Sequence, residues 1–418
     1  MWLDKFTMRN LEIFYPNTLE GKCLIDVIDN TISPMGGRLL KRWLALPSTD
    51  KSLIFKRHNI VEYFISSESE RNLVCEMLST LSDIERLVSK VATKRIMPRE
   101  LFNLNSSLKI IKPLKNKLKK TECKDLNKLI KSLSNCEQFI QKIDSTLSEN
   151  PPVNINKGNS ISSNFSDELK ELRSLSKNTK DFLEDMLKEQ SEITKIPSLK
   201  ISSNNVFGYY IEVRNTHKDK VPESWIRKQT LVNAERYITE ELKDYETKIL
   251  GAEQRIMELE IKIFDDLLDF CQSHILEIQN NSLIIAQLDC LTSFSNLSIS
   301  KNYVRPEIDD SLDIEIINGK HPVIESQLPI DKPYIPNSIT LNSEQQQIIM
   351  ITGPNMSGKS AILRQTAIIC LLAQIGCFVP AEKLKMGIID KIFTRVGASD
   401  NISMGESTFM VEMNETAL

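Results

Sequence analysis

The sequence lacks the features that mark several large classes of proteins. No apolar run is long enough to cross a membrane, and residues 1–7 carry charges where a signal peptide needs an apolar core. The 8 cysteines include no Cys-x-x-Cys pair and the 4 histidines are widely spaced, so neither a disulfide framework nor a zinc site is expected. We expect a cytoplasmic protein with no membrane partner.

An excess of positive charge is also missing. Lysine and arginine number 53 against 56 acidic residues, which gives a formal net charge of -3. Any binding to nucleic acid must therefore come from a local basic patch. At 418 residues the chain is too long for one compact core, so two or three domains are expected.

One motif near the end of the chain indicates nucleotide binding. The apolar run at 348–351 predicts a buried strand, residues 353–360 follow a Gly-x4-Gly-Lys-Ser pattern, and apolar residues recur at helical spacing from Ile362. This is the setting of a phosphate-binding loop, whose backbone N–H groups face the phosphates at the positive end of a helix. Lys359 would contact the β- and γ-phosphates of ATP, and the Ser360 hydroxyl would bind Mg²⁺. The phosphate-binding residues would be Gly353, Pro354, Asn355, Met356, Ser357, Gly358, Lys359 and Ser360.

Two long helical segments follow a region of shorter helices at residues 1 to about 150. Ser166 is a good N-cap for the first, which runs to about Thr194. Thr239 opens the second, whose apolar positions continue to about Ile275, roughly 50 Å at 1.5 Å per residue.

Between these helices the residues alternate as strands do. Residues 205–214 place apolar side chains on one face, and residues 230–238 predict a second extended piece. The simplest geometry is a pair of antiparallel helical arms that carries this small β tip.

Two other breaks in the pattern divide the chain. Pro34 and two glycines interrupt it before an amphipathic helix that ends near Leu46. Near Ser300 the pattern becomes strand-like, since residues 312–317 alternate and a Gly-Lys-His-Pro turn follows. We place a domain boundary there.

The β tip is locally basic in a chain that is acidic overall. Six cations between Arg214 and Arg236 outnumber three carboxylates, which is typical of contact with DNA phosphates. An ordinary charged hairpin has the same composition, so the residues alone leave both interpretations open. Nine lysines at 109–131 form a second basic segment, for which a solvated helix face is the favoured interpretation. The candidate DNA contacts are Arg214, Lys218, Arg227, Lys228, Asn233 and Arg236.

Several segments resemble the MutS family of DNA mismatch-repair proteins. Residues 353–360 read Gly-Pro-Asn-Met-Ser-Gly-Lys-Ser and residues 407–413 read Ser-Thr-Phe-Met-Val-Glu-Met, a combination similar to the family's ATPase domain. Residues 35–43 resemble its helical core, and residues 207–213 and 227–237 resemble its DNA clamp. The resemblance therefore favours double-stranded DNA as the ligand of the β tip.

The resemblance also implies roles for single residues. Asn355 corresponds to a residue beside the nucleotide phosphates, and Tyr334 falls where the family has an aromatic ring that stacks on adenine. Ser407 corresponds to a serine that reaches the γ-phosphate bound by the opposite subunit, which implies a homodimer with composite ATP sites. A mismatch-repair partner ATPase is a further expected partner.

The implied fold is multidomain, with helical and α/β parts. A helical core with the first long helix would take residues 1–195, the β clamp 196–239, and the second long helix 240–300. A P-loop ATPase domain of the ABC type, incomplete at its C-terminal end, would take residues 301–418.

Two departures from the family pattern bear on function. Family members open with a mismatch-reading domain that carries a Phe-x-Glu wedge, followed by a connector domain; the one Phe-x-Glu here, at 182–184, lies inside a long helix and is coincidental. The sequence also stops before the strand whose Asp-Glu binds Mg²⁺ and activates water, and before the dimerisation helices. Asp390 and Glu412 are weak substitutes, so no catalytic residue is assigned. We expect a fragment or a reduced gene product that binds Mg-ATP with hydrolysis near background.

Three functions compete on this evidence. The leading one is an ATP-switched DNA clamp of mismatch repair. The alternative within the fold is a MutS-like protein that holds recombination or branched DNA. A small-molecule P-loop kinase is the third, and it is disfavoured because no acceptor pocket is visible and the long helices would have no use in it. The sequence leaves open the preferred DNA structure and the partner proteins.

Overall fold

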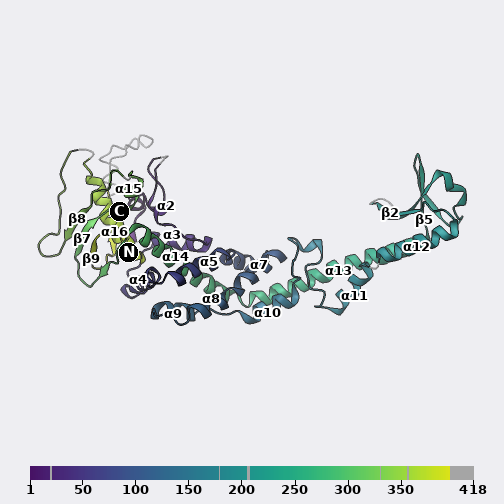
Figure 1. Ribbon diagram of the computed structural model, residues 1–418, viewed down its shortest axis with the longest axis horizontal. Helices are drawn as coiled ribbons and strands as arrows, with labels where there is room; N and C mark the ends of the chain where they lie inside the picture. The colour runs from purple at the N-terminus through teal and green to yellow at the C-terminus, as the bar shows by residue number, and fades with distance from the viewer. Residues whose placement is uncertain (19–20, 178, 205–207, 330, 355–356, 396–418) are drawn as a thin grey trace. The chain divides into compact units, whose positions relative to one another are not determined.

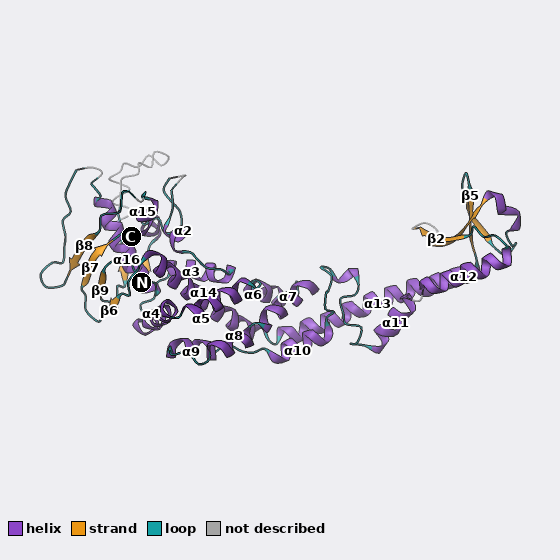
Figure 2. Cartoon of the chain, in the orientation of Figure 1, coloured by secondary structure: helices purple, strands orange, loops and turns teal. Residues whose placement is uncertain are grey.

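The computed structural model describes residues 1–418 except 19–20, 178, 205–207, 330, 355–356 and 396–418 (Figure 1). The chain forms two compact units, each built from separate stretches of sequence. The first contains Met1–Ser89, Ser106–Cys136 and the chain from Leu276 on, and the second contains Lys90–Asn105 and Glu137–Ile275. The described residues are mostly helical and the sheets are small, as expected (Figure 2). Within this part of the chain, no helix is long and apolar enough to span a bilayer.

Helices form most of the first unit, and one of them is buried over most of its length. This helix is α14 (Ile275–Lys301), whose apolar residues are not confined to one stripe, as a helix at the centre of a core requires. Ile285, Leu288 and Phe294 in it are completely buried. The other helices of the unit, of which α6 and α7 continue into the second, are α1 (Lys5–Asn10), α2 (Leu24–Ile28), α3 (Pro34–Ala45), α4 (Lys51–Ser66), α5 (Glu68–Ser79), α6 (Ile84–Ala92), α7 (Pro98–Lys109), α8 (Ile111–Leu118), α9 (Lys124–Lys131), α15 (Pro322–Gln327) and α16 (Lys359–Ile375).

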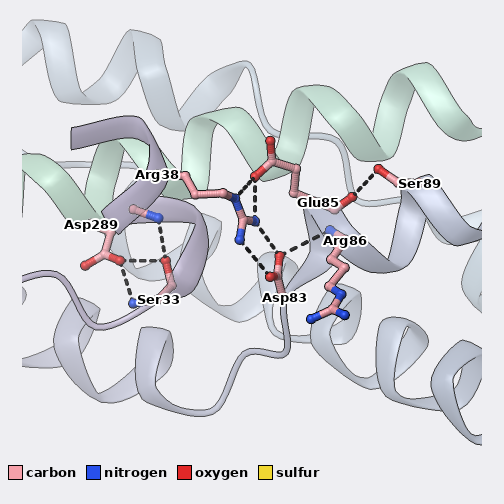
Figure 3. A network of polar contacts seen from close by, with 8 residues as sticks. Ser33, Arg38, Asp83, Glu85, Arg86, Ser89 and Asp289 are labelled. Atoms are coloured by element: carbon pink, nitrogen blue, oxygen red, sulfur yellow. Dashed lines mark hydrogen bonds and ion pairs between the residues drawn. The ribbon is translucent and has the colours of Figure 1, made fainter. Parts of the chain in front are cut away.

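The buried carboxylate of Asp289 joins α14 to the start of α3 (Figure 3). It accepts hydrogen bonds from the backbone N–H of Ile32 (2.9 Å) and from the N–H and hydroxyl of Ser33 (2.7 and 2.5 Å). Burial raises the pKa of Asp289, because a charged carboxylate loses its hydration there. A Cβ atom at Gly36 would lie 2.2 Å from the carboxylate, so the contact requires glycine at that position.

The start of α3 differs from the sequence prediction. Pro34 and the glycines were expected to break the chain before the helix, but Pro34 is its first residue and Gly36 lies in its first turn. Proline is compatible with that position because its missing N–H would be unpaired there in any case. The Ser33 hydroxyl then caps the helix by accepting from the Gly36 N–H at 3.1 Å.

A salt-bridge cluster ties α3 to α6 (Figure 3). Arg38 donates from both terminal nitrogens to Asp83 (2.9 and 2.7 Å) and from Nε to Glu85 (2.9 Å). The cluster is partly exposed, so each pair contributes little free energy, although the planar guanidinium bonds both carboxylates at once.

A four-stranded sheet packs against α16 in the first unit (Figure 2). Its order is β6-β9-β7-β8, with β6 and β9 parallel and β7 antiparallel to both β8 and β9. The strand expected at 312–317 is confirmed as β7. The strands of the unit are β6 (Glu307–Ile308), β7 (Ile314–Gly319), β8 (Asn337–Leu341) and β9 (Lys383–Met386), with β1 (Trp2–Leu3) and β10 (Lys391–Ile392) as a separate parallel pair.

Side chains of α4 hold the C-terminal end of α16. Arg57 donates to the carbonyl of Ile375 (2.8 Å), and the Nε2 atom of His58 contacts the carbonyl of Ala373 (3.0 Å). The Arg57 guanidinium also lies 3.6 Å from the ring centroid of Trp43. A cation at the negative end of a helix is favourable, and these bonds satisfy carbonyls that the helix itself leaves unpaired.

The second unit is a helix pair with a sheet at its end (Figure 1). Thr239 caps α13 (Glu240–Gln272) by accepting from the Leu242 N–H at 3.1 Å, as the sequence predicts. The range expected for the first long helix is helical in all its described residues from Asp167, as α11 (Asp167–Lys177) and α12 (Thr179–Thr194), and residue 178 lies outside the described residues. The unit also contains α10 (Glu137–Thr146) and the short 3-10 helices Ile155–Lys157 and Asn215–Lys220.

The buried carboxylate of Glu260 fastens a loop to α13. It accepts from the backbone N–H groups of Asn159 (3.0 Å) and Ser160 (2.9 Å) and from the Arg173 guanidinium (2.6 Å). Glu260 is fully buried. Both of its oxygens accept hydrogen bonds, and the Arg173 guanidinium balances its negative charge. The proline-containing loop near residue 150 is thereby fixed to the long helix.

The β tip is a four-stranded antiparallel sheet in the order β2-β3-β5-β4. The strands are β2 (Lys200–Asn204), β3 (Gly208–Arg214), β4 (Ile226–Thr230) and β5 (Ala234–Ile238). The prediction of one extended piece at 230–238 is wrong. The chain turns at 231–233, and the residues on either side belong to two paired strands, β4 and β5. β2 was not foreseen, since Lys200–Asn204 is too polar to alternate. The sheet packs on α12 and α13 through Met186, Ile211, Val213, Tyr237 and Leu242.

We expect the free energy of unfolding to fall as the pH falls from about 6.5 towards 4. Burial lowers the pKa of His58 to about 3 and that of His321 to about 4, so the folded chain keeps both rings neutral while the unfolded chain takes up protons. Urea unfolding at pH 7.5 and 5.5 measures the change, which should be about 1 kcal/mol for each histidine. His58→Gln should reduce this pH dependence, and an unchanged dependence in that variant would contradict the assignment.

Candidate functional site

The described part of the phosphate loop has the backbone geometry of an anion site. Gly358 caps α16 with a φ of 88°, a left-handed conformation that glycine adopts without strain. The N–H groups of the first turn of α16 have no partner within the helix and are available to phosphate oxygens. Asn355 and Met356, two of the expected phosphate contacts, lie outside the described residues.

Lys359, the predicted phosphate-binding cation, is bonded to the backbone of the phosphate loop. The Lys359 ammonium donates to the carbonyls of Gly353 and Pro354, the latter at 2.7 Å. Ser360 follows in the first turn of α16 and is exposed, as are Ser357 and Gly358. The loop amides, one ammonium and one hydroxyl therefore share the solvent-facing end of α16, which is the donor set that a nucleotide phosphate with its Mg²⁺ requires.

The expected buried strand at 348–351 is wrong. These residues form no strand, and the side chains of Ile348 and Met350 are each 87% exposed. A strand needs a hydrogen-bonded neighbour, and no described residue pairs with this backbone. Ile349 and Ile351 instead line an open, largely apolar cavity of about 610 Å³, together with residues of β8, α16 and β10.

Tyr334, the expected adenine platform, is brought beside α16. Its ring is half-buried and its hydroxyl donates to Oε1 of Gln365 at 2.9 Å. Partial burial raises the pKa of Tyr334, so the hydroxyl stays protonated at neutral pH. Sequence reasoning did not single out Gln365, because its partner Tyr334 lies 31 residues away in the chain.

The described structure does not bring Asp390, Glu412 or Ser407 to the phosphate loop. Ser407 and Glu412 lie outside the described residues. Asp390 stands beside β1, where its carbonyl accepts from the Trp2 N–H at 2.7 Å. Nothing in the described structure therefore makes Asp390 a metal ligand at the phosphate loop.

The candidate DNA contacts divide into exposed and internally bonded residues. Arg236 lies 4.4 Å from the ring of Tyr210 and donates to Gln229 at 2.8 Å, with a side chain that is 20% exposed. Arg227 is exposed but lies 3.4 Å from Glu235. The remaining candidates, Arg214, Lys218, Lys228 and Asn233, are exposed.

Comparison with known families agrees with both parts of this geometry. MutS domain III matches residues 6–295, which include the helices and the β tip, and MutS domain V matches residues 349–418, which include the phosphate loop. The chain belongs to the MutS family.

Similar curated proteins extend the match along the whole chain of this MutS family member. Proteins described as DNA mismatch repair protein MutS are 57% identical in Flavobacterium johnsoniae over 417 residues and 54% identical in Bacteroides thetaiotaomicron over 415 residues. That of Porphyromonas gingivalis is 50% identical over 415 residues. These alignments cover 99 to 100% of this chain but 47 to 48% of the relatives, so the chain spans about half their length.

We expect Arg236→Ala to loosen the sheet of the β tip, whereas Lys228→Ala should not. Arg236 joins Tyr210 on β3 to Gln229 on β4, and both contacts depend on the planar guanidinium. Hydrogen exchange of the β3 and β5 amides should become faster by about tenfold in the first variant, since about 1 to 2 kcal/mol of local contacts is lost. Equal exchange in both variants would show that Arg236 has no structural role.

Proposed function

We propose that this chain is the ATP-binding and DNA-holding part of a mismatch-repair protein, in which bound ATP changes how DNA is held. The observation that carries the proposal is the combination of two features in one chain. One is a phosphate loop at the start of α16, and the other is a cationic β tip on a long helix pair. The curated relatives named for mismatch repair support this over a role in recombination or branched DNA.

The nucleotide part of the proposal assigns roles to the described residues. The loop amides and Lys359 bind the phosphates, the Ser360 hydroxyl serves as a Mg²⁺ ligand, and the Tyr334 ring stacks on the base. The left-handed Gly358 and the position of Tyr334 beside α16 support this arrangement. The proposal includes a homodimer in which Ser407 reaches the partner's nucleotide, and that element rests on the family resemblance alone.

The DNA part of the proposal assigns duplex binding to the exposed cations of the β tip. Contacts to phosphates bring affinity and salt dependence without base preference. The apolar face of the sheet is occupied by α12 and α13, so the strands can offer only their other face and their turns to DNA. Arg214 on β3 and Lys218 in the following turn are exposed there.

Replacing Arg214, Lys218 and Lys228 together with alanine should weaken binding to duplex DNA equally for all sequences. The slope of log affinity against log salt concentration should fall by about three units, since each lost phosphate contact removes about 0.9. Fluorescence anisotropy at several salt concentrations measures both quantities.

A matched control removes the same charge elsewhere. Lys117, Lys119 and Lys120 are exposed in or beside α8, so their replacement with alanine changes net charge equally. This control should leave the slope unchanged. The opposite pattern, with a smaller slope only in the control, would place DNA binding on the lysine-rich helices.

Lys359→Ala should weaken binding of Mg-ATP by about a hundredfold or abolish it. The ammonium would make charge-assisted bonds to the β- and γ-phosphates, each of about 1.5 to 3 kcal/mol. Isothermal titration calorimetry measures the affinity, with Lys41→Ala, an exposed lysine of α3, as the control. ATP binding of equal strength in the Lys359 variant would exclude the phosphate loop as the nucleotide site.

A further inference from the structure

The side chain of Gln365 connects two parts of the nucleotide site. It projects from α16, the helix that begins at the phosphate loop, and it is completely buried. Its Oε1 atom accepts from the Tyr334 hydroxyl at 2.9 Å, and its Nε2 atom donates to the carbonyl of Asn337 at 3.3 Å. Both ends of one amide are therefore bonded to the segment that carries the expected adenine platform.

Burial of the Gln365 amide indicates a role beyond packing. A primary amide removed from water costs free energy unless its donor and its acceptor are both bonded, so an apolar residue would fill the same space more favourably if packing were its only role. The fold makes room for the amide: a Cβ atom at Gly319 would lie 2.8 Å from Nε2 of Gln365 and 2.9 Å from Ile369. The absence of a side chain at Gly319 therefore leaves space for the Gln365 amide.

Besides Gln365, the Tyr334 hydroxyl has the side chain of Asn337 and the backbone of His321 as hydrogen-bond neighbours. The described residues between Leu328 and Asn337 form no helix or strand, and Ile335 is 81% exposed. Tyr334 itself is only half-buried. The bond to Gln365 therefore limits where the ring can stand relative to the phosphate loop.

We propose that Gln365 is a positioning residue for the base of the bound nucleotide. It holds the Tyr334 ring at a set distance from the phosphate loop, so that the base and the triphosphate of one nucleotide are bound together. The inference rests on the proposed function, because it takes the Tyr334 ring as the surface on which the base stacks. Gln365 contributes to the part of the affinity that depends on the base and not to the part that depends on the phosphates.

The test compares Mg-ATP with magnesium tripolyphosphate, which has the phosphates but no base. Gln365→Leu removes both amide bonds, while Tyr334→Phe keeps the ring and removes only its hydroxyl, so the second variant remains informative if the first does not fold. Each should weaken Mg-ATP binding by about threefold to tenfold, the effect of one hydrogen bond, and leave tripolyphosphate binding unchanged. The double variant should weaken binding by less than the two single effects combined, because both changes break the bond between Gln365 and Tyr334.

Controls separate the inference from the proposed function. Thr366→Val alters the neighbouring residue of α16, whose hydroxyl bonds within the helix at 2.9 Å, and should change neither affinity. Equal weakening of both ligands by Gln365→Leu and Tyr334→Phe would overturn the inference and leave Gln365 a structural residue of α16. Unchanged Mg-ATP affinity in both variants would also overturn it. If Tyr334→Ala leaves Mg-ATP binding unchanged, the platform itself is misassigned, and the role proposed for Tyr334 fails together with the inference.

Discussion

The geometry of the proposed nucleotide site depends on how α16 is fixed in the first unit. Its C-terminal carbonyls are bonded by Arg57 and His58 of α4, and Arg57 is itself stacked on Trp43 of α3. Between these carbonyls, the side chain of Gln374 donates to the carbonyls of Ser48 and Ile389 and accepts from the Ile389 N–H. These contacts are buried polar bonds, which are costly to break and so allow little rotation of the helix. The C-terminal end of α16 is therefore held firmly by the helical core.

The same helix organises both sides of the proposed ATP site. Its first turn and its N-cap, Gly358, provide the phosphate-facing end, and Gln365 reaches the segment of Tyr334. Arg364, the residue before it, pairs with Glu12 of the N-terminal region at 2.9 Å. A movement of α16 would strain its contacts with Glu12, α3 and α4 together. This is a physical route by which bound nucleotide can act on the helical core.

The β tip is stabilised by its own set of contacts. Its sheet has its own apolar cluster with α12 and α13, and Phe182 stacks on Tyr245 with ring centroids 3.6 Å apart. Arg236 and Glu235, which composition alone would count among the surface charges, are used inside the sheet. The cations that remain exposed are fewer than the sequence suggests, and they lie on β4, at the end of β3 and in the 3-10 helix that follows it. Charge counting therefore overestimates the surface available to DNA.

The sequence by itself determined the parts that depend on local chemistry. Thr239 as the cap of α13, the left-handed Gly358 in the phosphate loop and the alternating strand β7 follow from near neighbours in the chain, and the quoted motifs were enough to recognise the MutS family. Residues 348–351 show the limit of that reasoning, because an apolar run becomes a strand only where another backbone pairs with it. Gln365, Arg57 and Asp289 show the same limit for polar residues. Their roles arise from partners distant in sequence, such as Tyr334, Ile375 and Ser33, and only the tertiary structure decides which buried donors and acceptors meet.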